Sequence, residues 1–95
     1  MALFKVCFDV APVKMYLDGT WTRCGFVNNL YVWAGSESQA IVAARSRLDT
    51  ALSERAAKGH LDYSDAIFNV ESTERSTKFW KLARPEGFVF YRQDS

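Results

Sequence analysis

A single helix with a capping signal at each end is the feature that most constrains how this chain can fold. Ser36-Glu37-Ser38-Gln39 has the form of a capping box, in which the Ser36 hydroxyl accepts from the third helical amide and Gln39 reaches back. Gly59 follows the last periodic residue, where a left-handed C-cap is favoured, and Lys58 precedes it at the negative end of the helix dipole. The sequence therefore predicts one helix over residues 36–58.

One face of this predicted helix carries the side chains that we expect to be buried. At 100° per residue, five apolar residues fall within an arc of about 100°: Ile41, Ala44, Leu48, Ala51 and Leu52. At about 1.5 Å per residue the helix would be roughly 33 Å long, enough to cross a small sheet. We therefore expect it to pack along the whole of one sheet face.

Strands are predicted before the helix. Residues 3–10 have the period-2 alternation of a half-buried strand, with four apolar residues on one side: Phe4, Val6, Phe8 and Val10. Pro12 lacks an amide hydrogen, so it ends the regular pairing or lies at an edge, and residues 15–17 can resume a strand beyond it. Asp18-Gly19-Thr20 predicts a turn, and a second strand follows over residues 26–34.

Further strands are predicted after the helix. Residues 62–65 indicate a loop, residues 66–71 a third strand, and residues 72–78 a polar turn or a short helix. Residues 79–82 and 88–91 flank a proline-glycine turn and favour a hairpin. We therefore expect an α+β fold: an antiparallel sheet of about four to six strands with one helix on one face, a two-layer sandwich. The length of 95 residues favours a single domain, 1–95.

Composition excludes several classes of protein. The chain is 48% hydrophobic and 24% charged, which is typical of a globular protein. Its formal net charge of +1 is too small to indicate a duplex-binding protein. No apolar run approaches the roughly 18 residues of a membrane span, and residues 1–5 lack the pattern of a secretory signal. We expect a cytoplasmic protein without membrane association.

The residue types that carry catalysis are not grouped in this sequence. His60 is either a general base or a polar residue that closes the helix C-cap, and no catalytic partner is placed near it. Asp62 and Asp65 either join His60 around a cation or form the turn. Cys7 and Cys24 indicate two reduced thiols, with one disulfide as the alternative. Without a glycine-rich phosphate loop or metal-type cysteine spacing, we expect no enzyme activity, no cofactor and no metal site.

The opposite face of the predicted helix suggests a contact surface. It carries small residues at a heptad-like spacing where an exposed face usually carries Lys and Glu: Ala43, Ser46, Thr50, Ser53 and Ala57, with Arg47 to one side. Small side chains allow a second helix or sheet to approach closely, although they are also tolerated on a solvent face. In the second strand Leu30 and Val32 share one face, and Tyr31 and Trp33 share the other.

These features favour a small non-catalytic protein-interaction module: a regulator, adaptor or inhibitor that binds a protein partner or a second copy of itself as a homodimer. The predicted partner-binding residues are the small residues of the helix (Ala43, Ser46, Thr50, Ser53 and Ala57), Arg47, Tyr31 and Trp33. Trp21 with Arg23 can add exposed aromatic surface. The alternative is a single-stranded nucleic-acid-binding domain, because the C-terminal hairpin interleaves bases and aromatics: Lys78, Trp80, Lys81, Arg84 and Arg92. In a plainer interpretation these aromatics are the core of the hairpin.

Overall fold

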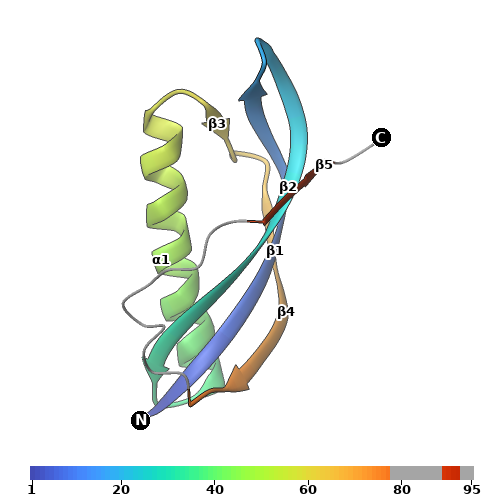
Figure 1. The fold of residues 1–95 in the computed structure, drawn as a ribbon. Helices are drawn as coiled ribbons and strands as arrows, with labels where there is room; N and C mark the ends of the chain where they lie inside the picture. Colours follow the sequence, from blue (N-terminus) through green and yellow to red (C-terminus); the bar gives the residue numbers. More distant parts are fainter. Residues whose placement is uncertain (78–88, 93–95) are drawn as a thin grey trace.

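The computed structural model describes residues 1–77 and 89–92. Two long strands, β1 (Ala2–Leu17) and β2 (Thr20–Ala34), precede the helix α1 (Glu37–Ala57). A short strand β3 (Leu61–Asp62), an edge strand β4 (Ile67–Arg75) and β5 (Val89–Arg92) follow it. All of the strand pairs are antiparallel, and α1 packs on one face of the sheet (Figure 1). The predicted α+β fold is confirmed.

The sheet is built around the β1–β2 hairpin. Its strand order is β3-β1-β2-β5, and β4 also pairs with β1. Both β3 and β4 lie along the edge of β1 that β2 leaves free: β4 pairs with residues 4–11 and β3 with residues 14–15. The part of the chain that the structure describes therefore contributes five strands, within the predicted range.

The hairpin turn explains why β2 begins earlier than predicted. Asp18 and Gly19 both have positive φ, at 51° and 82°, as a two-residue type I′ turn requires. This turn has the twist of the strands that flank it, so pairing begins at once with Leu17 opposite Thr20. The strand thus starts at Thr20 rather than at residue 26. As expected, the regular pairing is interrupted near Pro12, where the register shifts between Val10 and Val13.

The helix has the predicted limits and caps. The Gln39 amide donates to the Ser36 hydroxyl at 3.3 Å, while the Gln39 side chain accepts from the amide of Gly35 at 3.0 Å. Gly59 follows the C-cap residue with φ of 84°. The buried residues of α1 are Ala40, Ala44, Leu48 and Leu52. Four buried positions at intervals of four residues define the face that packs on the sheet.

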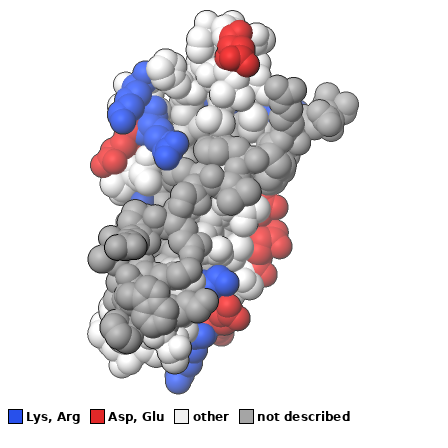
Figure 2. Space-filling view, viewed as in Figure 1, with Lys and Arg blue, Asp and Glu red and all other residues white. Residues whose placement is uncertain are grey.

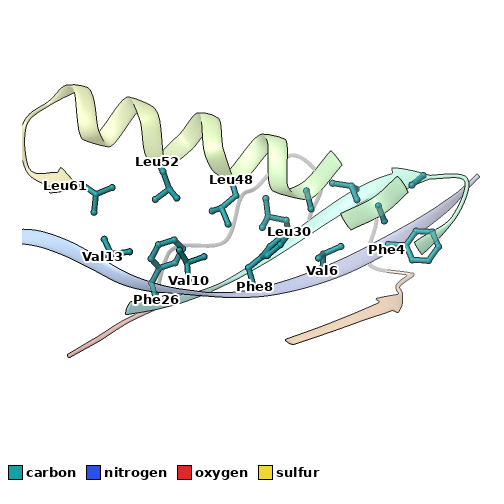
Figure 3. Close-up of a cluster of buried hydrophobic side chains, with 14 residues drawn as sticks. Phe4, Val6, Phe8, Val10, Val13, Phe26, Leu30, Leu48, Leu52 and Leu61 are labelled. Carbon is teal, nitrogen blue, oxygen red and sulfur yellow. The ribbon is translucent and has the colours of Figure 1, made fainter. Parts of the chain in front are cut away.

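The hydrophobic core lies between this helix face and the sheet (Figure 3). Phe8, Phe26, Leu48 and Leu52 are its largest fully buried side chains. Alternation along the strands decides which side chains enter it. Leu30 and Val32 belong to the core, so Tyr31 and Trp33 belong to the face of β2 that points away from the helix. The sequence predicted that the two pairs lie on opposite faces, and the structure decides which pair faces the helix.

The segment after the helix differs from the prediction. The turn expected over residues 72–78 is wrong for residues 72–75, which continue β4. The register shifts between Cys7 and Phe8, and Glu71 is the extra residue of a bulge that lets the strand run on beside β1. The short strand β3 was not predicted, because two residues carry no periodic signal.

At the C-terminal end, the strand predicted over residues 88–91 is confirmed for residues 89–91, which belong to β5 and pair with β2. Its expected hairpin partner, residues 79–82, lies outside the described residues. Within the described residues, no helix combines the length and apolar character needed to cross a membrane.

Candidate functional site

The tip of the β1–β2 hairpin exposes three large apolar residues. It extends beyond the end of α1 and past β3 (Figure 1). Tyr16 is 43% exposed, Leu17 38% and Trp21 50%, although all three lie in regular strand. Single exposed apolar residues are ordinary, but neighbouring ones on a protruding element are a feature of contact surfaces.

The aromatic rings at the tip hold one another in place. Tyr16 and Trp21 are cross-strand partners whose ring centroids are 5.6 Å apart in an edge-to-face arrangement. On its other side Tyr16 stacks on His60, with ring centroids 6.3 Å apart and planes 15° apart. The Tyr16 amide also donates to the His60 carbonyl at 3.0 Å. Tyr16, Leu17, Trp21 and His60 form what we call the tip cluster.

A row of charged residues borders the tip cluster. In the register of the sheet, Lys14 of β1 lies opposite Arg23 of β2 on one side and opposite Asp62 of β3 on the other. Lys14 is two positions before Tyr16, so these residues lie on the same sheet face as the Tyr16 ring. The Ser64 amide, the Ser64 hydroxyl and the charge of Lys14 together lower the pKa of Asp62 below its ordinary value. Asp62 is therefore ionised at neutral pH. The aromatic row thus has a rim that carries both signs of charge.

The small residues predicted to form a contact strip on α1 differ from one another in how exposed they are. Ser46, Thr50 and Ala57 are exposed, whereas Ala43 is half-buried against the core. Ser53 shares a hydrogen bond of 2.7 Å with the Tyr63 hydroxyl, so the chain itself contacts one member of the strip.

Two further features of this helix face bear on its use as a surface. The Thr50 hydroxyl donates to the Ser46 carbonyl at 3.0 Å, which satisfies the hydroxyl within the helix. Val42, which the sequence analysis did not select, is 70% exposed. This side of α1 therefore presents the exposed apolar side chain of Val42 and a Thr50 hydroxyl that is already hydrogen-bonded within the helix.

The other predicted partner-binding residues lie along β2. Arg47 donates from Nη1 to the Tyr31 carbonyl at 2.8 Å, which connects α1 to that strand. The Tyr31 side chain is 4% exposed, whereas Trp33 is 50% exposed. Of this aromatic pair, Trp33 is the one accessible in the single chain.

Most of the predicted nucleic-acid set lies outside the described residues: Lys78, Trp80, Lys81 and Arg84. Arg92 is the last residue of β5. Among the residues that the structure describes, no three His, Cys, Asp or Glu side chains are close enough together to hold a metal ion. The described charges on the face seen in Figure 2 lie in several small separate groups, some acidic and some of mixed sign, rather than in one basic patch.

No family model matches the chain, and comparisons with curated proteins and with solved structures found no match. The site therefore has to be judged on its own geometry. The sequence predicts exposed aromatic surface at Trp21 but not the pairing of Trp21 with Tyr16. The adjacent Asp18 and Gly19 were the available signal, because a two-residue turn places Leu17 opposite Thr20 and so Tyr16 opposite Trp21. No local signal places His60 beside Tyr16.

Proposed function

We propose that this chain is a small non-catalytic protein-interaction module, with the tip cluster as its main contact. The observation that carries the proposal is the exposure of the paired rings of Tyr16 and Trp21 on one face of a protruding hairpin, with Leu17 exposed on the other face. Trp, Tyr and Arg are the residue types in which interface energy concentrates, and the tip offers all three, with Arg23 in the adjoining row.

The rigidity of the tip supports this function. A type I′ turn, a cross-strand ring contact and a stacked His60 restrict Tyr16 before any partner arrives. Side chains that are already ordered lose less conformational entropy when they are buried in an interface. The charged row of Lys14, Arg23 and Asp62 would form the polar rim that usually surrounds such a contact.

The exposed side of α1 offers a second surface of different character. Its exposed side chains are small enough for a partner element, such as a helix of a second copy, to approach closely: Val42, Ser46, Thr50 and Ala57. A module with these two surfaces would work by binding to a partner and covering part of its surface, as a regulator, adaptor or inhibitor does. We also propose that it acts in the cytoplasm, where Cys7 and Cys24 would remain reduced.

A matched pair of tryptophan substitutions tests the main contact. Trp21 and Trp33 are both 50% exposed and lie near opposite ends of β2. We expect Trp21→Ala to weaken capture of a partner from native lysate, or self-association in sedimentation velocity, by about tenfold or more. Trp33→Ala should have a much smaller effect. Equal binding by wild type and Trp21→Ala would remove the tip cluster from the proposal, and Thr50→Arg tests the α1 surface in the same assays.

Single-stranded nucleic acid is the second candidate ligand, because Lys14 and Arg23 stand beside the exposed ring of Trp21. Binding of this kind weakens steeply as salt rises. An oligonucleotide that binds at low salt, releases at moderate salt and is lost with Trp21→Ala would favour this candidate over a protein partner.

A further inference from the structure

A second site lies away from the hairpin tip, in a groove between α1 and the segment that joins β3 to β4. The groove has a volume of about 540 Å³, within the range of small-molecule sites. Arg45 and Asp49 line it from the helix. Opposite them, Leu61 and Asp62 line it from β3, Tyr63 from the joining segment and Phe68 from β4. It therefore combines a cation, two carboxylates and an apolar floor.

Arg45 lies at the groove, where its guanidinium contacts an aromatic ring and, within residues 1–77 and 89–92, no acidic partner. Its guanidinium carbon lies 4.9 Å from the centroid of the Phe68 ring, and Phe68 is itself packed edge-on against Phe8, at 6.4 Å between centroids. Among the described residues, no carboxylate lies within 4.0 Å of Arg45. A guanidinium stacked by one face on an aromatic ring keeps its N–H edges available for a carboxylate.

Asp49 lies one helical turn after Arg45, and its carboxylate is hydrogen-bonded to Tyr63 rather than to Arg45. The Tyr63 hydroxyl donates to its Oδ1 at 3.2 Å and also bonds Ser53, so Asp49 is turned towards the loop. Residues four apart lie on the same side of a helix, with Cβ atoms about 5–6 Å from each other. The opposite charges of Arg45 and Asp49 are therefore held close together without forming an ion pair.

The charges of the groove select among ligands. Asp49 and Asp62 outnumber Arg45, so a simple anion would meet net repulsion. A ligand that carries both an ammonium and a carboxylate can satisfy Asp49 and Arg45 together. Phe68 and the small exposed part of Leu61, which both line the groove, give such a ligand an apolar surface to cover.

We propose that this groove binds a free α-amino acid with an apolar side chain. Arg45 receives its carboxylate, Asp49 its ammonium group, and the side chain lies against Leu61 and Phe68. This site is separate from the interaction surface at the tip, and it would add small-molecule binding to the function proposed for the module.

Blocked ligands test each contact separately. Titration of the labelled full chain with L-leucine, followed by NMR, should give saturable shifts at Arg45, Asp49 and Tyr63. L-leucinamide lacks the carboxylate and N-acetyl-L-leucine lacks the ammonium group, so each should bind about tenfold more weakly or worse. Arg45→Lys and Asp49→Asn should weaken L-leucine similarly, whereas Glu54→Gln, on an exposed part of the same helix, should not.

Two results would overturn the proposal: no saturable shift with L-leucine at concentrations up to about 20 mM, or equal affinity for the free and the blocked ligands. Folding of each variant is checked by its own spectrum. Trp21→Ala should leave leucine binding unchanged, so that this site and the tip contact can fail independently.

Discussion

At the scale of the residue, Asp62 links the turn after β3 to the charge beside the tip cluster. Its Oδ1 accepts from the amide of Ser64 at 3.0 Å and from the Ser64 hydroxyl at 2.7 Å. These bonds, with the charge of Lys14, outweigh the opposing effect of desolvation and lower the pKa of Asp62. One side chain thus stabilises the turn and contributes a fixed negative charge to the tip and to the groove.

The lowered pKa of Asp62 gives the stability of the chain a defined dependence on pH. The folded pKa is below the ordinary value of 3.8, so the carboxylate stabilises the fold fully above that value. The stabilisation is lost as pH falls through the lowered pKa. Asn can keep the hydrogen bonds of the turn without the charge, so Asp62→Asn should melt below wild type at pH 7. We expect the difference in Tm to shrink below pH 3.8; a constant difference would contradict this account.

At the scale of the element, the hairpin turn should be more sensitive to backbone than to side-chain volume. Gly19 has φ of 82°, yet a Cβ added there would meet nothing within 4 Å. The cost of Gly19→Ala is therefore the left-handed backbone itself, about 1 kcal/mol. Gly19→Asn should cost less, since Asn tolerates this conformation. Urea denaturation of both variants measures the difference, and an Ala variant as stable as wild type would be inconsistent with a type I′ turn.

How much could be predicted from the sequence also differs between elements. The limits of α1 were predicted to within a residue, because Ser36, Gln39 and Gly59 act locally. Residues 72–75 were missed because the bulge at Glu71 breaks the alternation and because polar residues suit an edge strand. The stacking of His60 on Tyr16 and of Arg45 on Phe68 joins residues far apart in sequence. Such contacts depend on the tertiary arrangement, so no local pattern predicts them.

At the scale of the whole molecule, one core supports three separate surfaces. The core between α1 and the sheet fixes where the tip cluster, the exposed side of α1 and the groove lie. Among the described residues that these surfaces use, only Leu61 of the groove belongs to the buried core. Apart from Asp62, which borders both the tip cluster and the groove, substitutions at the surfaces should alter one contact each, whereas a change in the core should affect all of them through stability.

Leu48 and Trp21 provide the comparison that tests this separation. Leu48 is 1% exposed and faces the sheet from the middle of α1, so Leu48→Ala should leave a cavity and cost about 2–5 kcal/mol. Leu48→Met conserves volume and should cost less than about 1.5 kcal/mol. Trp21→Ala removes an exposed ring and its contact with Tyr16, so it should cost no more than about 1.5 kcal/mol. Urea denaturation of the three variants, measured beside partner capture, distinguishes the roles. A Trp21→Ala variant that unfolded as easily as Leu48→Ala would make the tip a part of the fold rather than a contact surface, because an exposed ring that binds a partner contributes little to the stability of the free chain.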